Sequence, residues 1–278
     1  MYKITTKQVL TPVTKLMTVE APLVARKAEP GQFVIVRVSG SGERIPLTIA
    51  DFDRGAGTIT LVFQEVGYTT RLLGTKEEGD SILDVVGPLG VPAELMSQGR
   101  VVCVGGGVGV APVYPKAKAL HEAGVEVISI IGARSYDLLI MEDMMRAVSR
   151  QLYVCTDDGS FGYHGFVSGK LQELLASGEQ FDEVIAVGPL PMMRATVEVT
   201  RPLGIKTLVS LNPIMVDGTG MCGACRVTVG GKTKFCCVDG PMFDGHQVDF
   251  AEAIRRSQMY LEEEKTALHR CGCQGGDA

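Results

Sequence analysis

The feature that most constrains the fold is a run of glycines that directly follows a short apolar segment. The segment RVVCV leads into Gly105, Gly106 and Gly107, and the residues from Pro112 onward have helical composition. Short apolar runs and helical stretches then alternate along the chain, with a further helix predicted over residues 138–150. This alternation predicts a parallel β-sheet covered by helices.

Glycines in such a loop let the backbone approach a pyrophosphate closely, and the following helix presents free N–H groups at its start. The position of the loop within the strand–helix alternation favours dinucleotide binding, with a tight structural turn as the alternative. A second loop follows the apolar run VIAV, where a strand of the same sheet should end. The residues predicted to contact the dinucleotide are Gly106, Gly107, Val108, Gly109, Ala111, Pro112, Gly188, Pro189 and Met192.

Two acidic residues follow another predicted strand, LYVC. Asp157 or Asp158 can accept a hydrogen bond from a ribose hydroxyl, and a carboxylate there would repel a 2′-phosphate. This pattern favours NAD(H) over NADP(H). Arg134 indicates the opposite preference, because an arginine can bind a 2′-phosphate, and a simple turn explains the aspartate pair equally well.

Cysteines crowd into one segment near the C-terminus. Cys222, Cys225 and a later cysteine match the plant-type [2Fe–2S] spacing C-x4-C-x2-C followed by a distant Cys. Asp217 stands where the first Cys of that pattern would be, and a carboxylate oxygen can bind iron. Cys236 and Cys237 are neighbours, and neighbours on an extended strand face opposite ways, so only one of them is expected to bind. A zinc site and a reduced, metal-free CxxC remain alternatives.

Composition and charge argue against several other classes of protein. With no export signal after Met1, we expect the reducing cytoplasm, where eight cysteines bind metal or do redox chemistry more often than they pair. A net charge of −5 without a Lys/Arg run argues against nucleic acid as a partner, and no apolar run approaches the length of a membrane span. The predicted organisation is a β-rich antiparallel barrel over 1–97, the α/β domain over 98–209, a metal module over 210–250, and a helical tail over 251–278 that includes Cys271 and Cys273.

The segment GGGVGVAP, placed after a β-rich domain, resembles the nucleotide loop of the ferredoxin–NADP reductase superfamily. The resemblance implies a flavin-binding barrel that holds FAD, beside an NAD-binding α/β domain. In this superfamily a motif R-x-Y-[ST] meets the flavin and a later Gly/Thr loop holds its pyrophosphate. Thr48 matches the hydroxyl position, Leu47 stands in place of the aromatic ring, and Arg44 lies one residue further away. The flavin-binding residues implied are Arg44, Pro46, Leu47, Thr48, Val66, Gly67, Thr69 and Thr70, with ordinary barrel turns as the alternative.

A cysteine followed by x-D-G-P-x-F resembles the electron-transfer subunit of dihydroorotate dehydrogenase, and this resemblance covers essentially the whole chain. It implies that Cys237, rather than Cys236, closes the cluster. Asp217 in place of the first Cys resembles the small subunit of the electron-bifurcating NADH-dependent ferredoxin:NADP oxidoreductases. The implied iron ligands are therefore Asp217, Cys222, Cys225 and Cys237.

Together these resemblances imply an electron-transfer subunit that moves electrons between NAD(H), FAD and a [2Fe–2S] cluster, with the cofactors and no side chain carrying the chemistry. The implied partner is a larger flavin and iron–sulfur subunit that uses ferredoxin and NADP(H), in a cytoplasmic heterodimer. The first alternative is the electron-transfer subunit of an NAD-dependent dihydroorotate dehydrogenase, which is expected to carry Cys at position 217. The second is a zinc-stabilised, nucleotide-binding regulator without turnover.

Overall fold

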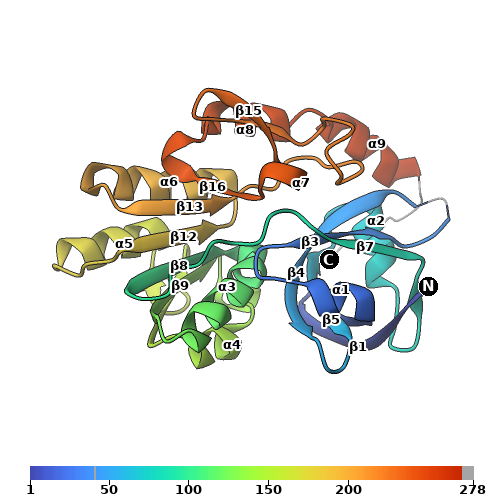
Figure 1. Cartoon of the computed structure of the whole chain (residues 1–278), viewed down its shortest axis with the longest axis horizontal. Helices are drawn as coiled ribbons and strands as arrows, with labels where there is room; N and C mark the ends of the chain where they lie inside the picture. Colours follow the sequence, from blue (N-terminus) through green and yellow to red (C-terminus); the bar gives the residue numbers. More distant parts are fainter. Residues whose placement is uncertain (41, 271–278) are drawn as a thin grey trace.

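The structure is a computed structural model that describes residues 1–40 and 42–270, so Cys271 and Cys273 lie outside the described residues. Two seven-stranded sheets lie side by side, and the C-terminal segment, red and orange in Figure 1, lies above them in that view. Within the ranges just given, every helix is too short or too polar to cross a lipid bilayer.

The first sheet is wholly antiparallel, with strand order β6-β1-β2-β5-β4-β3-β7. Only Leu83 separates β6 from β7, although these two strands lie at opposite ends of that order. The sheet must therefore curl until its edges meet, which confirms the predicted barrel. Its strands are β1 (Tyr2–Thr11), β2 (Thr14–Glu20), β3 (Phe33–Arg37), β4 (Arg44–Asp53), β5 (Thr58–Gln64), β6 (Ser81–Ile82) and β7 (Asp84–Leu89), accompanied by the short helices α1 (Pro22–Lys27) and α2 (Tyr68–Gly74).

The second sheet has the order β11-β10-β9-β8-β12-β13-β16, and all its pairs are parallel except β13 with β16. From β8 the chain builds outward through β9 and β10, then returns to place β12 on the other side of β8. Its strands are β8 (Arg100–Gly106), β9 (Glu126–Ala133), β10 (Gln151–Thr156), β11 (Tyr163–His164), β12 (Glu183–Val187), β13 (Lys206–Ser210) and β16 (Met242–Asp244).

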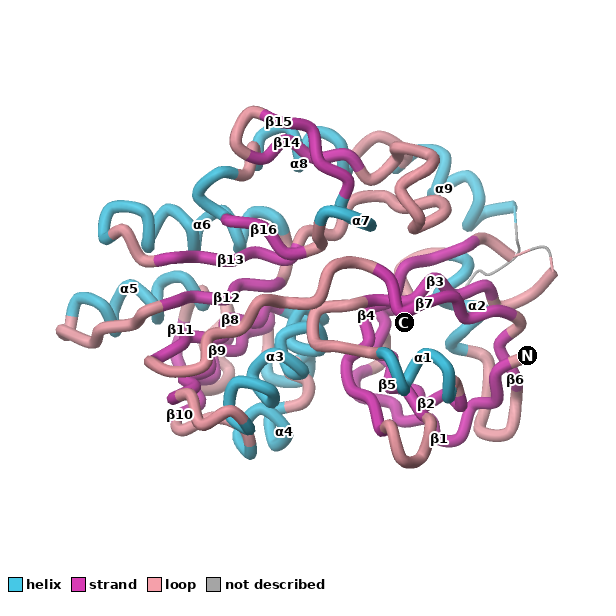
Figure 2. The backbone as a smooth tube through the Cα atoms, in the orientation of Figure 1, coloured by secondary structure: helices cyan, strands magenta, loops and turns pink. Residues whose placement is uncertain are grey.

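Helices cover both faces of this sheet, because its central strands are apolar on both sides. On β8, Val102 and Val104 belong to one core cluster and Val101 and Cys103 to another, as the alternation of side chains along a strand requires. The helices are α3 (Val110–Glu122) and α4 (Glu142–Ala147) on one face, and α5 (Val167–Ala176) and α6 (Leu190–Thr200) on the other. Figure 2 shows how these helices and strands alternate along the tube.

One predicted helix is much shorter than expected. Over residues 138–150 only α4 forms, preceded by the 3₁₀ turn η2 (Tyr136–Leu138). Met141 has a left-handed backbone with φ of 55°, which stops the helix from starting earlier. Ile140 and Met141 are both buried in the core beside α3, so packing determines the conformation here rather than helix propensity.

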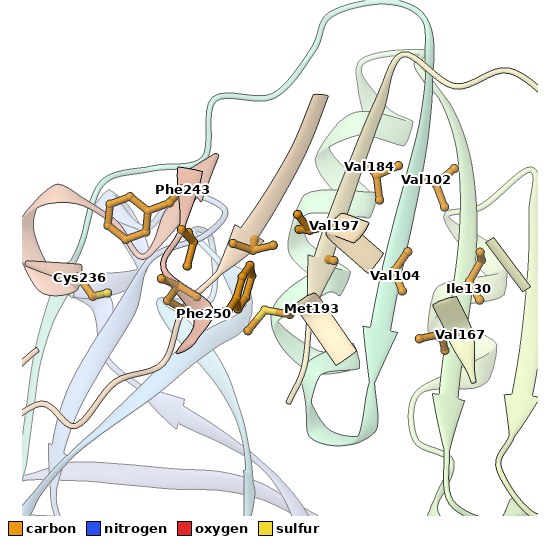
Figure 3. Close-up of a cluster of buried hydrophobic side chains, with 14 of the residues drawn as sticks. Val102, Val104, Ile130, Val167, Val184, Met193, Val197, Cys236, Phe243 and Phe250 are labelled. Carbon is orange, nitrogen blue, oxygen red and sulfur yellow. The ribbon is translucent and has the colours of Figure 1, made fainter. Parts of the chain in front are cut away.

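The cysteine-rich segment packs on both sheets. It contains β14 (Arg226–Val229), β15 (Lys232–Phe235) and α7 (Cys236–Asp239), and its last strand β16 extends the parallel sheet. Figure 3 shows Cys236, Phe243 and Phe250 in one apolar cluster that continues to Met193 of α6 and to Val104 of the second sheet. The C-terminal residues form two helices, α8 (Phe250–Ser257) and α9 (Leu261–Arg270), where the sequence indicated one helical tail.

Candidate functional site

The two predicted nucleotide loops meet at the point where the strand order of the parallel sheet reverses. The first runs from β8 through the 3₁₀ turn η1 (Gly107–Gly109) into α3, and the second joins β12 to α6. The loops are in close contact: a Cβ at Gly188 would lie 2.8 Å from Met192 Cε and 3.2 Å from Gly106 O. Crevices at such reversals are where open α/β sheets bind nucleotides.

Some residues of the first loop are needed for packing, and others are exposed where a ligand could bind. A Cβ at Gly109 would overlap Val187 O, and Ala111 is fully buried, so both positions serve the packing of α3. Gly107 has a φ of +55° and only open space where a Cβ would stand, and Val108 beside it is exposed. Gly107 and Val108 therefore present the backbone that a ligand can approach. Pro112 O accepts a hydrogen bond from Lys116 Nζ inside the helix.

The two aspartates differ in their hydrogen bonding, which the sequence did not show. Asp158 Oδ1 accepts hydrogen bonds from the N–H (2.9 Å) and hydroxyl (2.6 Å) of Ser160, which lower the pKa of Asp158. The Asp157 carboxylate has no hydrogen-bond partner within the described part of the chain. Partial desolvation and the neighbouring Asp158 raise the pKa of Asp157, while Arg134 opposes the rise. Asp157 is thus the carboxylate available to a ribose, and Asp158 stabilises the loop.

An aromatic pair beside these aspartates was missed by the sequence analysis. Tyr136 and Phe161 are both exposed, and their ring centroids lie 5.0 Å apart at the carboxyl ends of β9 and β10. Ser160 ties their two loops together, because its hydroxyl accepts from Tyr136 N at 2.9 Å. Exposed aromatic rings fixed beside a nucleotide loop can stack on a base. The signal was available, since both residues follow apolar strands within a few positions of Arg134 or Asp158.

The residues of the first predicted flavin motif lie on β4, where successive side chains point to opposite faces of the sheet. Leu47 is buried in the barrel core with Ile49, so it does not occupy the outward position that the aromatic residue of the motif suggested. Thr48 pairs with Phe33 of β3, and Pro46 pairs with Ile35. Pro46, Thr48 and the exposed Arg44 therefore share the outer face of the strand.

The second flavin loop forms the start of helix α2. The hydroxyl of Thr69 donates to Glu43 Oε2 at 2.9 Å, and the hydroxyl of Thr70 accepts from Gly67 N at 2.9 Å. Both hydroxyls thus have protein partners, and Val66 is exposed just before the helix. The loop can still bind a pyrophosphate through the backbone N–H groups in the first turn of α2, because these groups have no hydrogen-bond acceptor within the helix.

Asp217 organises the cysteine loop. Its Oδ1 accepts from Thr219 N at 2.8 Å and its Oδ2 accepts from Cys222 N at 3.0 Å. These N–H groups, that of Thr219 first, lower the pKa of Asp217 and keep the carboxylate ionised. Gly218 has a φ of +77° and fits tightly against β3, where a Cβ would lie 2.8 Å from Ile35 Cγ1. The loop therefore brings Asp217 and Cys222 together on the barrel.

The other two predicted ligands form a second pair. Cys225 Sγ and Cys237 Sγ are buried and lie 3.2 Å apart as free thiols. Desolvation and the hydrogen bond between the two thiols raise the pKa of Cys237 to about 12. Iron binding to this thiol must therefore release a proton. Cys236 is fully buried in the apolar cluster that also contains Phe243 and Phe250 (Figure 3), and its backbone N–H donates to Cys225 O at 3.1 Å.

The donor set suits a cluster of two irons, with Asp217 and Cys222 on one side and Cys225 and Cys237 on the other. Across residues 1–40 and 42–270, no three His, Cys, Asp or Glu side chains converge as the ligands of a single metal ion. The four-ligand assignment itself remains a prediction.

Comparisons with known proteins agree with this geometry. Residues 212–249 match the model for the iron–sulfur cluster binding domain of dihydroorotate dehydrogenase B. Residues 103–198 match the model for the oxidoreductase NAD-binding domain. The first match contains all four predicted iron ligands, and the second contains the two loops that meet at the sheet reversal. The chain therefore has an iron–sulfur domain and an NAD-binding domain, which favours the cluster over the zinc alternative.

Three relatives extend the similarity to the whole chain. A protein of Clostridium beijerinckii, described as an uncharacterized protein in the adh 3′ region, is 51% identical over 99% of each chain. The electron transfer subunit homolog of dihydroorotate dehydrogenase B (NAD⁺) from Thermotoga maritima is 51% identical, over 91% of this chain and 89% of that protein. A solved structure concerning flavin-based electron bifurcation by the NADH-dependent reduced ferredoxin–NADP oxidoreductase has a chain that is 47% identical with a TM-score of 0.92, covering 98% of both chains. The chain thus belongs to the family of dihydroorotate dehydrogenase B electron-transfer subunits and their homologues.

Proposed function

We propose that this chain is the electron-transfer subunit of a flavin-based electron-bifurcating complex, in which it moves electrons between NAD(H), FAD and a [2Fe–2S] cluster. Its partner would be a larger flavin and iron–sulfur subunit that handles ferredoxin and NADP(H). The similarity to the bifurcating oxidoreductase along 98% of both chains supports this assembly, as does Asp217 at the first ligand position.

The observation that carries the electron-transfer role is the shared face of β3 and β4. Residues paired across adjacent strands point to the same side of the sheet, so Pro46 and Thr48 share a face with Ile35 and Phe33. Ile35 and Phe33 belong to the core cluster that contains Cys225 and Cys237. Gly218, next to Asp217 in the cysteine loop, packs against Ile35, where a Cβ would lie 2.8 Å from Ile35 Cγ1. Neighbouring strands are about 4.8 Å apart, so the predicted flavin residues of β4 lie about one strand away from the residue of β3 on which the cysteine loop packs.

The chain's own residues then have distinct tasks. The loops at Gly107 and Met192 would hold the nicotinamide end of the dinucleotide, and Asp157 would hold a ribose. Pro46 and Thr48 would orient the flavin toward both the nicotinamide and the cluster. When bound, FAD accepts or gives a hydride and exchanges single electrons, which the cluster relays one at a time.

A second candidate is the electron-transfer subunit of an NAD-dependent dihydroorotate dehydrogenase. The family model and the name of the Thermotoga maritima relative favour it. Asp217 is the residue that separates the candidates, because that subunit is expected to have four cysteine ligands.

The test is anaerobic purification of the native complex from its source, followed by two assays. The proposal expects flavin and [2Fe–2S] absorption bands and NADP⁺ reduction that requires NADH and reduced ferredoxin together. Dihydroorotate-dependent NAD⁺ reduction, with no such requirement, would instead assign the chain to the second candidate. A native complex that contains no iron would contradict both.

A further inference from the structure

Two arginines hold the turn between Cys222 and Cys225 from outside. Arg226 Nε donates to Gly223 O at 3.1 Å, and Arg256 Nη2 donates to Ala224 O at 3.1 Å. Arg226 begins β14 directly after the turn, whereas Arg256 comes from α8, far along the sequence. Helix α8 is therefore attached to the predicted cluster loop by a charged hydrogen bond.

These bonds fix the orientation of two peptide planes. In a trans peptide the C=O and the N–H point in opposite directions, so a carbonyl held outward turns the next N–H inward. The N–H groups of Ala224 and Cys225 are thereby directed away from the arginines. Neither group has a hydrogen-bond partner among the residues that the structure describes. N–H groups of this kind can donate to cluster sulfur, which is one determinant of the reduction potential.

The charge of Arg256 is also uncompensated. Neither Arg226 nor Arg256 has an ion-pair partner within residues 1–40 and 42–270. Arg256 is half-buried and its Nε is fully buried without an acceptor. A positive charge in a partly desolvated place stabilises negative charge nearby more than one in water does. A [2Fe–2S] cluster gains one negative charge on reduction.

We propose that Arg256 is a positioning residue for the cluster, and that with Arg226 it raises the cluster's reduction potential. It does so by orienting the Ala224 and Cys225 N–H groups and by placing a fixed positive charge behind the turn. This inference rests on the cluster assigned under the proposed function. It makes α8 part of the redox site, although α8 lies beyond the residues that supply the predicted ligands.

The test is EPR-monitored redox titration of the full-length chain with its cluster, for the wild type, Arg256→Met and Arg256→Lys. Arg255→Met is the matched control, because Arg255 is exposed and precedes Arg256 on the same helix. Iron content and the visible spectrum are measured for every sample. For Arg256→Met we expect the equilibrium constant for one-electron reduction to fall by about tenfold, or about 59 mV.

Arg256→Lys keeps the charge but loses the planar donor geometry, so its potential should fall by a smaller amount in the same direction. If Arg256→Met does not retain its cluster, the Lys variant alone decides the question. Potentials equal to the wild type in every Arg256 variant that keeps its cluster would overturn the inference, as would an equal fall in Arg255→Met. A wild-type chain without iron would instead contradict the proposed function.

Discussion

Met192 lies directly over Gly106, so close that a Cβ on Gly106 would overlap its sulfur. The same side chain also covers Gly188, which leaves it wedged between the two nucleotide loops. We therefore expect Gly106→Ala to force the loops apart. It should slow flavin reduction by NADH by about tenfold or more, because a misplacement of the reacting groups by about 1 Å can cost on the order of 100-fold in rate. Stopped-flow bleaching of the flavin's visible absorption measures this rate.

The double variant Gly106→Ala/Met192→Ala should recover most of the rate, because the shorter side chain leaves room for the new methyl group. Gly109→Ala is the matched comparison. Its Cβ would meet the backbone of Val187 and Gly188 rather than a side chain, so Met192→Ala should not rescue it. Equal rescue of both glycine variants would show that the contact with Met192 is not the cause.

The second prediction concerns the choice of dinucleotide. We expect the wild type to react faster with NADH than with NADPH, because Asp157 presents a free carboxylate at the predicted ribose site and would there repel a 2′-phosphate. Asp157→Ser should reduce that preference by about tenfold, equal to about 1.4 kcal/mol, and should let Arg134 meet the phosphate. Flavin reduction rates with each donor give the ratio directly.

Asp158→Ser is the control for this experiment. Its carboxylate binds Ser160, which in turn supports the loop of Tyr136, so the variant should weaken binding of both donors without changing their ratio. A wild type that prefers NADPH, or a larger change of ratio in the Asp158 variant, would contradict the assignment of Asp157.

Sequence patterns predicted the parts of this structure in which backbone geometry dictates residue type. Gly106 and Gly109 could be located because only a residue without Cβ fits beside Met192 and Val187 O. The proximity of the two loops could likewise be inferred, since strand alternation placed both loops at one edge of the sheet. Fold class and nucleotide loops were therefore within reach of local reasoning.

Features that depend on packing between distant parts of the chain could not be predicted from the sequence. Leu47 was grouped with the flavin motif, but the pairing of β3 with β4 fixes it in the barrel core. The hydroxyl of Thr69 was predicted to face a pyrophosphate, but it donates to Glu43, which directly precedes Arg44 of the other flavin motif. The attachment of Arg256 to the CxxC turn was invisible for the same reason. Each of these contacts joins residues from different elements, which helix or strand periodicity in the sequence cannot relate.

The third prediction concerns a buried amine. Lys116 is fully buried on α3, and desolvation lowers its pKa to about 8. In the unfolded chain the pKa of the same group is about 10.4, so between these two pH values the unfolded state binds more protons than the native state. Stability therefore rises with pH across that window, and the charged amine costs on the order of 3 kcal/mol below it.

We expect Lys116→Met to be more stable than the wild type at pH 7, with a difference that shrinks as the pH rises from about 8 to about 10.4. Urea unfolding of both proteins at several pH values measures the difference. Lys118→Met is the control: this lysine is bonded to Asp51 at 2.9 Å, so its loss should destabilise the chain at pH 7. A gap between Lys116→Met and wild type that stays constant with pH would refute the linkage argument.

The last prediction concerns Asp217, the residue that distinguishes the two proposed assemblies. Asp217→Cys should keep a [2Fe–2S] cluster, because it restores the plant-type set of four thiolates. Its EPR spectrum and reduction potential should change, since a soft thiolate replaces a hard oxygen ligand at one iron. Asp217→Ala removes that ligand and also the acceptor for Cys222 N, so its cluster should be labile.

Asp217→Asn separates the two roles of the carboxylate, because the amide oxygen can still accept one of the loop's N–H bonds while binding iron more weakly than a carboxylate. We expect it to keep the loop folded but to lose iron faster than the wild type. Cys236→Ser should retain the cluster, whereas Cys237→Ser should lose it, because the Cys237 thiol contacts Cys225 Sγ at 3.2 Å and Cys236 is fully buried in the apolar core. Iron content and EPR across these variants decide the assignment. If Asp217→Ala and Asp217→Cys both give the wild-type spectrum, Asp217 is not a ligand, and the dihydroorotate dehydrogenase candidate becomes the stronger one.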